Sequence, residues 1–531
     1  MKTLGEYLVE MLSAYGIDTV FGIPGVHTVE LYRGLASSPI RHVTPRHEQG
    51  AGFMADGYAR VSGRPAAAFV ITGPGLTNIV TAMAQVYGDS IPMLVISSVN
   101  QTSRLGMGQG DLHEVRRQGL IAAQAAAFSH TVLSAEQLPT ILARAFAVFE
   151  SDRPRPVHIE IPVDLLTADA GHLPVVRAPA AAQACPPPER LAQASKLLDA
   201  ATRPLIIAGG GAKWASASLA ALAQRCDAPL VQTTNARGIL PLDHPLSVPA
   251  SPTFDAVRTL IGEADLVLLV GTEIGRTDYN MYDRDEVEFG PKVLRIEIDA
   301  EQMHKGVTPY LPLLGGAAAT IDGLLDLLGN DQIDRSGAAR AAAARQAAWA
   351  ELSQTMQTDV GFLDRIRDAV PTATIVGDST QAIYAGNLYF QAAQPASWFN
   401  SATGYGTLGF GVPAAIGAAL ASDAPVICLT GDGGFQFCGP EMSVAMQEGA
   451  PVLFIVWNNS GYGEIKTFMI DNDITPVGVD LHTPDFVQWG KACGLKALNT
   501  ATLADFDAAL AAFAANPEPT LIEIDEAVIR G

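Results

Sequence analysis

The chain has 531 residues, and its 55 acidic and 34 basic side chains give a formal net charge of −21. Hydrophobic residues make up 48% and charged residues 17% of the chain, a balance that is typical of a globular protein and excludes a disordered one. An acidic chain lacks the basic surfaces that nucleic acids and anionic membranes select, so we expect neither as a partner. No apolar run approaches the roughly 20 residues of a membrane helix, and the length predicts about three domains.

The first residues predict an amphipathic helix of the first domain. Leu4, Leu8 and Met11 follow helical spacing. Glu6 and Glu10 interrupt the apolar core that a secretory peptide needs. The five cysteines are widely spread and form no CxxC pair, which indicates a reducing compartment and neither a disulfide framework nor a zinc site. We therefore expect a cytoplasmic protein.

Short apolar runs bounded by glycine or proline alternate with longer helical patterns along the whole chain. Strands that are apolar almost throughout are typical of parallel sheets covered by helices on both faces. The clearest runs are 69–71, 93–96, 204–208, 266–270, 426–429 and 452–457. The predicted fold class is α/β, with three doubly wound parallel-sheet domains.

Two changes in composition divide the chain. Residues 167–188 are rich in alanine and proline and predict a linker. A second break falls near Gly329-Asn330-Asp331 and precedes an alanine-rich helical pattern over 338–352. We therefore predict domains over 1–170, 185–330 and 345–531.

In the third predicted domain, an acidic residue follows one strand and an amide follows the next. Asp432 lies in the glycine-rich segment Gly431, Asp432, Gly433, Gly434, a helix is predicted over 441–448, and Asn459 follows the second strand. Because the carboxyl ends of parallel strands meet at one edge of a sheet, Asp432 and Asn459 should converge there. Their hard oxygens suit Mg²⁺ or Ca²⁺, and the glycines would let a diphosphate approach the backbone.

The two asparagines stand 26 and 27 residues after Asp432, and this spacing resembles the motif of the thiamine diphosphate-dependent enzymes. The resemblance implies that Asp432, Asn459 and the Gly461 carbonyl anchor Mg²⁺ and the diphosphate. It further implies cofactor contacts from a larger set, namely Thr380, Gln381, Gly431, Gly433, Gly434, Tyr462, Gly463, Glu464 and Ile465.

Residues 19–60 and the segments around Thr72, Asn78 and 89–92 resemble the pyrimidine-binding domain of the acetohydroxyacid synthase-like branch. The resemblance gives Glu48 the role of the acid that hydrogen-bonds N1′ of the aminopyrimidine. From the residues alone, Glu48 falls in the first turn of a predicted helix, where the helix dipole favours its charge.

Residues 404–411 resemble the loop that bends the cofactor in this family. The resemblance sets Leu408 under the thiazolium ring and assigns the Gly406 carbonyl to the 4′-amino group. Leu408 also satisfies the simpler interpretation of a core leucine. By the same resemblance, the cofactor ylid attacks a 2-oxo acid, CO₂ leaves, and the enamine either takes a proton to give an aldehyde or attacks a second carbonyl.

The chain departs from the acetohydroxyacid synthases at several positions. Val99 replaces a glutamine and Glu464 replaces an apolar residue. The segments 233–238 and 271–276 do not carry the flavin-contacting signatures of those enzymes. These differences argue against bound FAD and against simple acetolactate synthesis.

The overall pattern is most similar to decarboxylases of 5-guanidino-2-oxopentanoate. Glu464 would then pair with the guanidinium or handle a proton, and Asp111 and Glu114 either line the same pocket or belong to a solvated loop. His27 and His113 are candidate proton donors, and ordinary hydrogen-bonded histidines are the alternative.

Two enzymatic alternatives and one non-catalytic alternative stay open. The runner-up is an acetolactate synthase-type carboligase acting on pyruvate, followed by another lyase or an acetyltransferase on the same scaffold. A non-catalytic paralogue is disfavoured because Glu48, Asp432 and Asn459 are intact. The resemblance also implies a homodimer or homotetramer in which Glu48 and Asp432 of one site come from different subunits.

Overall fold

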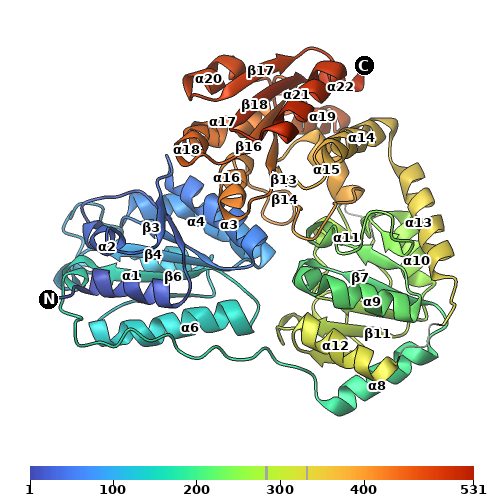
Figure 1. Ribbon diagram of the computed structural model, residues 1–531, viewed down its shortest axis with the longest axis horizontal. Coiled ribbons are helices and arrows are strands. Elements are labelled where there is room, and N and C mark those ends of the chain that lie inside the picture. Colours follow the sequence, from blue (N-terminus) through green and yellow to red (C-terminus); the bar gives the residue numbers. More distant parts are fainter. Residues whose placement is uncertain (282–284, 330–332) are drawn as a thin grey trace.

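The computed structural model describes residues 1–281, 285–329 and 333–531. They form three α/β units, each built on its own six-stranded sheet, and the three units lie at the corners of a triangle (Figure 1). The strand pairs within these sheets are parallel, which confirms the predicted fold class. Within the described ranges, no helix combines the length and the apolar character needed to span a bilayer.

The first unit is a doubly wound sheet with helices on both faces. Its strand order is β2-β1-β3-β4-β6-β5. The strands are β1 (Thr19–Gly22), β2 (Arg41–Val43), β3 (Ala66–Val70), β4 (Met93–Val99), β5 (Phe128–Thr131) and β6 (Val157–Pro162). One face packs against α1 (Leu4–Ala14), α2 (Val29–Leu35) and α6 (Leu138–Ser151), and the other against α3 (Glu48–Ser62), α4 (Pro74–Asp89) and α5 (Gln118–Ala123).

The central unit has the strand order β12-β11-β10-β7-β8-β9. Its strands are β7 (Pro204–Ala208), β8 (Leu230–Gln232), β9 (Ser247–Val248), β10 (Leu266–Val270), β11 (Val293–Glu297) and β12 (Leu311–Leu314). Its helices are α8 (Pro188–Ala200), α9 (Ser216–Cys226), α10 (Asp255–Gly262), α11 (Arg276–Tyr279) and α12 (Ala317–Leu328). The strand order reverses between β7 and β10, and such a reversal opens a crevice at the carboxyl ends of the strands.

The connections agree with the composition of the chain. The described chain forms no helix between α7 (Val163–Leu166) and α8, where the proline-rich linker is predicted. The alanine-rich pattern forms α13 (Gly337–Glu351), which packs on α10 and leads to the third unit. The predicted break at Asn330 and Asp331 lies outside the described residues.

The third unit repeats the topology of the first, with the order β14-β13-β15-β16-β18-β17. Its strands are β13 (Thr374–Gly377), β14 (Trp398–Asn400), β15 (Val426–Gly431), β16 (Val452–Asn458), β17 (Lys496–Thr500) and β18 (Thr520–Asp525). Its helices are α14 (Gln354–Ala369), α15 (Gln381–Leu388), α16 (Gly411–Ala421), α17 (Asp432–Cys438), α18 (Met442–Glu448), α19 (Gly463–Asp471), α20 (Phe486–Ala492), α21 (Leu503–Ala515) and α22 (Glu526–Arg530).

The segment from Asp432 to Gly449 forms two short helices with a 3₁₀ turn between them. Asp432 does not lie in an irregular loop but begins helix α17. The helix predicted over 441–448 is confirmed within one residue as α18, and Glu441 closes the 3₁₀ turn η6 (Gly439–Glu441) that precedes it. Gly449 ends α18 in a left-handed conformation, as predicted.

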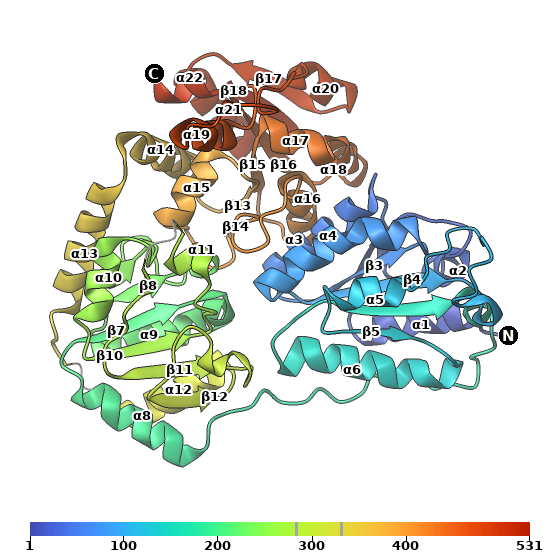
Figure 2. The same cartoon turned by 180° about the vertical axis from the view of Figure 1, so that it is seen from behind.

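The first and third units share a core where α3 crosses α16 (Figure 2). A Cβ atom on Gly57 would lie 1.9 Å from the carbonyl oxygen of Ala414. On the facing helix, a Cβ atom on Gly417 would lie 1.9 Å from the carbonyl oxygen of Met54. The two helix backbones therefore touch directly, and this contact fixes the position of α3, which begins at Glu48.

Candidate functional site

The strand ends of the third unit bring a buried carboxylate next to an amide. Asp432 follows β15 and Asn459 follows β16, the two strands being hydrogen-bonded neighbours with Gly431 opposite Trp457. Within the described chain, both carboxylate oxygens of Asp432 and Oδ1 of Asn459 are buried without a hydrogen bond of good geometry. Burial raises the pKa of Asp432 to about 6. Buried oxygens without donors are suited to a divalent cation.

The backbone around Gly461 is held by contacts with the segment 479–480. Gly461 forms a bridge with Asp480, and the Tyr462 N–H donates to the Val479 carbonyl over 2.8 Å. The described residues contain no group of three or more His, Cys, Asp or Glu side chains that could hold a metal ion. A site of one carboxylate, one amide oxygen and one backbone carbonyl falls outside that definition and suits Mg²⁺.

Three helices begin beside Asp432, namely α15, α17 and α19. Thr380, the N-cap of α15, is buried, and a Cβ atom on Gly431 would lie 3.4 Å from its Oγ1. A Cβ atom on Gly463 would lie 2.6 Å from Asn459 Nδ2 and 3.7 Å from Gln381 Nε2. The Tyr462 ring covers Gly433 in the same way, and Gly434 follows in α17. Helix N-termini and close backbone amides favour an anion such as a diphosphate.

Asp378 also belongs to this edge of the sheet, although no sequence motif indicates it. Its buried carboxylate accepts hydrogen bonds from the N–H groups of Ser379 (2.7 Å) and Gly411 (3.0 Å). Burial raises the pKa of Asp378 to about 6. An acid directly after a buried strand was the available signal, since Asp432 shows the same pattern.

The loop before α16 carries Gly406 and Leu408 and contacts α4 of the first unit. Gly406 is exposed with a φ of 76°, and Leu408 is half-buried. The Thr407 N–H donates to Gln85 Oε1 over 3.5 Å, and the Thr403 hydroxyl donates to Asp89 over 2.9 Å. The first unit therefore helps to set the shape of this loop.

On the first unit, Glu48 is the first residue of α3 and is half-buried. Its carboxylate accepts a hydrogen bond of 3.0 Å from the side-chain amide of Asn78. Thr72 is buried, and its hydroxyl donates to Gln118 Oε1 over 2.9 Å. Gln118, which the sequence analysis did not single out, also accepts from the Gly73 N–H over 3.0 Å and donates to the Ser98 carbonyl over 2.7 Å.

His27 and His113 are neighbours. Their ring centroids are 5.4 Å apart at an interplanar angle of 84°, and in the described chain neither buried Nδ1 atom has a hydrogen-bond partner. Burial, followed by the charge of His113, lowers the pKa of His27. A Cβ atom on Gly73 would lie 2.4 Å from the His113 carbonyl oxygen, so the pair adjoins the segment that carries Thr72.

The acidic residues near these groups differ in what they contact. Glu464 is exposed in the first turn of α19 beside the exposed Ile465, and no described residue forms a hydrogen bond or ion pair with it. Asp111 Oδ1 accepts from the Arg104 guanidinium over 2.9 Å, while Oδ2 is buried without a partner among the described residues. Glu114 instead accepts backbone N–H groups of its own loop, which lower its pKa.

Within one chain, the predicted site residues thus fall into two separate groups. Glu48, Thr72 and Asn78 lie on the first unit, and Asp432, Asn459 and Gly461 on the third. Across the described residues, no hydrogen bond or ion pair joins a member of one group to a member of the other.

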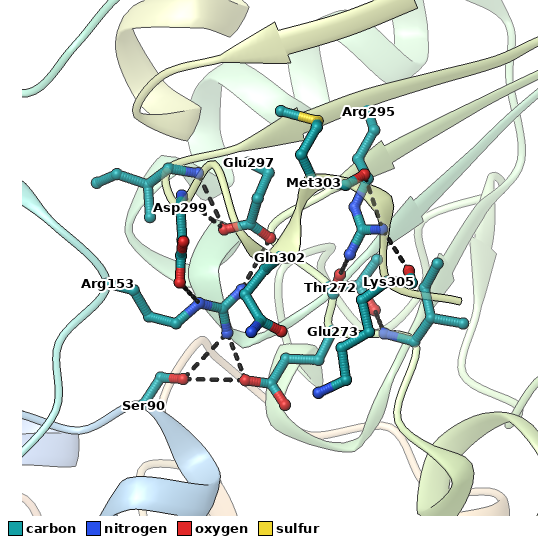
Figure 3. Close-up of polar contacts among 12 residues, drawn as sticks. Ser90, Arg153, Thr272, Glu273, Arg295, Glu297, Asp299, Gln302, Met303 and Lys305 are labelled. Carbon is teal, nitrogen blue, oxygen red and sulfur yellow. Dashed lines mark hydrogen bonds and ion pairs between the residues drawn. The ribbon is translucent and has the colours of Figure 1, made fainter. Parts of the chain in front are cut away.

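The crevice of the central unit is crossed by ion pairs (Figure 3). Arg153, from the segment after α6, contacts Glu273, lies 2.8 Å from Glu297 and lies 3.6 Å from Asp299. The three acids follow or end β10 and β11, and two of them, Glu273 and Glu297, line a cavity of about 660 Å³ together with Arg153 and Lys213. These acids occupy the Arg153 guanidinium and would compete with a diphosphate for it, and the expectation that FAD is absent stays a prediction.

The sequence matches three family models along most of its length. Residues 2–120 match the N-terminal TPP binding domain of thiamine pyrophosphate enzymes, 191–324 their central domain, and 378–524 their C-terminal TPP binding domain. The chain therefore belongs to the thiamine pyrophosphate enzymes, and thiamine diphosphate is its cofactor.

Several curated relatives align with nearly the whole chain. A protein of Pseudomonas aeruginosa named "Probable 2-ketoarginine decarboxylase AruI" is 46% identical over 535 residues, which cover 99% of this chain and 95% of the relative. The acetolactate synthase isozyme 1 large subunit of Escherichia coli is 31% identical over 98% of this chain and 93% of the relative. An acetolactate synthase of Arthrospira platensis is 29% identical over 93% and 88%, respectively.

Proposed function

We propose that this enzyme is a Mg²⁺- and thiamine diphosphate-dependent carboxy-lyase that converts 5-guanidino-2-oxopentanoate (2-ketoarginine) to CO₂ and the corresponding aldehyde. The observation that carries the proposal is the 46% identity with the Pseudomonas aeruginosa relative along nearly the whole of both chains. Glu464 supports it, because a carboxylate that no described residue pairs with stands where the resemblance expects an apolar residue in the acetohydroxyacid synthases.

The site residues of the first and third units would have different roles. Asp432, Asn459 and the Gly461 carbonyl would hold Mg²⁺, since their oxygens fit a hard cation. The bound cofactor supplies the electron sink for loss of CO₂. Glu48 would hold and return a proton at its carboxylate, and His27 and His113 would supply the proton that completes the aldehyde.

Around these residues, a further set would bind the cofactor. Thr72, Asn78, Gly406 and Leu408 would contact its rings. The diphosphate would lie against Thr380, Gln381, Gly431, Gly433, Gly434, Tyr462, Gly463 and Ile465. The helix N-termini of α15, α17 and α19 would stabilise its negative charge.

Glu464 and Asp111 would recognise the cationic tail of the substrate. A guanidinium pairs with a carboxylate through two parallel N–H groups, a geometry that Lys cannot reproduce. Asp111 already accepts the guanidinium of Arg104, and its second oxygen is unpartnered in the described chain. Glu464 has its whole carboxylate available, which makes it the stronger candidate.

The runner-up is an acetolactate synthase-type carboligase acting on pyruvate, which the 31% identity with the Escherichia coli enzyme supports. A panel of 2-oxo acids with Mg²⁺ and thiamine diphosphate separates the two. We expect CO₂ release to be fastest from 5-guanidino-2-oxopentanoate, well ahead of pyruvate and of the neutral 2-oxohexanoate. Acetolactate from pyruvate without CO₂ release from the guanidino acid would refute the decarboxylase proposal.

For the assembly, we propose a cytoplasmic homodimer or homotetramer whose sites combine Glu48 of one subunit with Asp432 of another. Co-expression of Glu48→Gln and Asp432→Asn chains tests this arrangement. A mixed dimer keeps one intact site, so about a quarter of the wild-type activity per chain should return on random pairing. If both residues served one site within one chain, the mixture would stay as inactive as each variant alone.

A further inference from the structure

A buried carboxylate of the third unit contacts the end of the helix that carries Glu48. Glu441, the last residue of the 3₁₀ turn η6, is 1% exposed. The Arg46 N–H donates to its Oε1 and Oε2 atoms over 3.0 and 2.9 Å, and the His47 N–H donates to Oε1 over 3.0 Å. Glu441 therefore satisfies two backbone donors at the N-terminus of α3 from another domain.

The contact is close enough to restrict the residues on α3. A Cβ atom on Gly50 would lie 2.2 Å from Glu441 Oε1, so a larger residue in this first turn would displace the carboxylate. Burial raises the pKa of Glu441 to about 7, and the N–H groups of Arg46 and His47 oppose that rise. The N–H groups of Arg46 and His47 thus stabilise the charged form of the buried Glu441 carboxylate.

Other contacts of the same segment are exposed. Arg46 Nε donates to the Ser443 hydroxyl over 3.0 Å, and Arg41 pairs with Glu448 over 2.8 Å. Exposed ion pairs hold a geometry weakly, because water and salt compete for both partners. The buried Glu441 contact is therefore the one that can fix the direction in which α3 begins.

We propose that Glu441 is a positioning residue, which aims the Glu48 carboxylate by capping the N-terminus of α3 from the diphosphate-binding side of the chain. Arg46 and His47 directly precede Glu48, and His47 is the N-cap of α3, whose Nδ1 accepts the Gln49 N–H over 3.1 Å. Holding the N–H groups of these two residues therefore holds the start of α3. The Glu48 carboxylate accepts one hydrogen bond from a described residue, over 3.0 Å from Asn78. This role rests on the proposed function, in which Glu48 acts on the cofactor.

Glu441→Gln keeps the shape and one acceptor oxygen, whereas Glu441→Ala leaves two buried donors without an acceptor. We expect kcat to fall about 10-fold in the first and about 100-fold in the second, because a misplaced catalytic group loses rate steeply with distance. The affinity for thiamine diphosphate, measured calorimetrically, should change far less than kcat. The near-UV circular dichroism of the bound cofactor should weaken, since it reports the surroundings of the aminopyrimidine.

Amide hydrogen exchange in the cofactor-free protein gives a readout without activity. Exchange at residues 46–50 should speed up in both Glu441 variants and stay unchanged in Glu448→Gln, which removes an exposed contact of the same interface. If Glu441→Ala does not fold, the isosteric Glu441→Gln decides alone.

Two results would overturn the inference: wild-type kcat in both variants, or a parallel loss of kcat, cofactor affinity and folded fraction. The dichroism and exchange measurements need no substrate, so they remain valid if the 2-oxo acid is a different one. Failure of the proposed function is recognised separately, by a wild-type protein that releases no CO₂ from any 2-oxo acid in the panel.

Discussion

Asp432 and Asn459 follow neighbouring parallel strands, and within the described chain neither the Asp432 carboxylate nor the Asn459 amide oxygen has a hydrogen bond of good geometry. A buried carboxylate is unfavourable for folding unless a cation or proton compensates it, and the backbone N–H groups near Asp432 offset this cost only in part. Burial raises the pKa of Asp432 to about 6 for the same reason, because the charged carboxylate is poorly solvated there. The arrangement is therefore better suited to a chain with a bound cation at this site than to the bare chain.

Replacement of Asp432 by Asn should have opposite effects on the cofactor-free and cofactor-loaded protein. Without cofactor, the unfolding temperature should rise, because the buried charge is gone. With Mg²⁺ and thiamine diphosphate at 100 times their Kd, the wild type should gain about 2.7 kcal/mol and the variant almost nothing. Differential scanning calorimetry measures both effects. Asp471→Asn, an exposed acid on α19, is the control, and an equal gain in Asp432→Asn would contradict the proposed metal site.

Replacement of Glu48 by Gln should remove the carboxylate that Asn78 now contacts. We expect kcat for CO₂ release to fall by about 100-fold or more, the usual contribution of a positioned acid–base group. Asn78→Ala, which leaves the carboxylate in place, should cost less. An unchanged turnover rate in Glu48→Gln would mean that the proposed thiamine mechanism does not operate here.

Replacement of Glu464 by Gln should discriminate between substrates. Loss of a carboxylate that pairs with a guanidinium should raise KM for 5-guanidino-2-oxopentanoate about 10-fold, while KM for neutral 2-oxo acids stays the same. Asp471→Asn on the same helix controls for a general loss of negative charge. A uniform drop in kcat for all substrates would instead assign Glu464 to proton transfer.

His158 should make the stability of the fold depend on pH. It is fully buried between the Ser97 and Ser129 hydroxyls, and burial lowers its pKa to about 3. The unfolded chain therefore takes up the proton first, so stability present above pH ~6.5 is lost as the pH falls toward 3, by about 1.4 kcal/mol per unit. Unfolding temperatures measured from pH 7 to 5 should fall less steeply in His158→Gln. Identical slopes would exclude this residue as the cause.

Purified protein should carry no flavin. Glu273 and Glu297 line the central crevice where a dinucleotide would lie, and because both pair with Arg153, they would compete with its diphosphate for that cation (Figure 3). The visible spectrum should lack flavin absorption, and added FAD should leave the unfolding temperature unchanged. Stoichiometric flavin in the protein as purified would contradict this expectation.

Several features of the fold could be predicted from the sequence because they depend on local patterns. The runs 204–208 and 266–270 coincide with β7 and β10, since a buried parallel strand needs a continuous apolar run. Glu48 lies in the first turn of a helix, and Gly449 ends one, as local helix signals predict. The Asp432 motif was also readable, because both of its parts have a fixed spacing along the chain.

Contacts between distant residues could not be read in this way. The pairing of His27 with His113, the hydrogen bonds of Gln118, and the contact of Glu441 with the start of α3 each join separate segments. Such contacts leave no periodic pattern in the sequence, because they depend on how the units pack. The sequence by itself therefore determined the three α/β units, and it predicts the cofactor motif and the acid Glu48. Only the tertiary structure decided which buried groups lie beside these residues, since direction and burial arise when the domains meet.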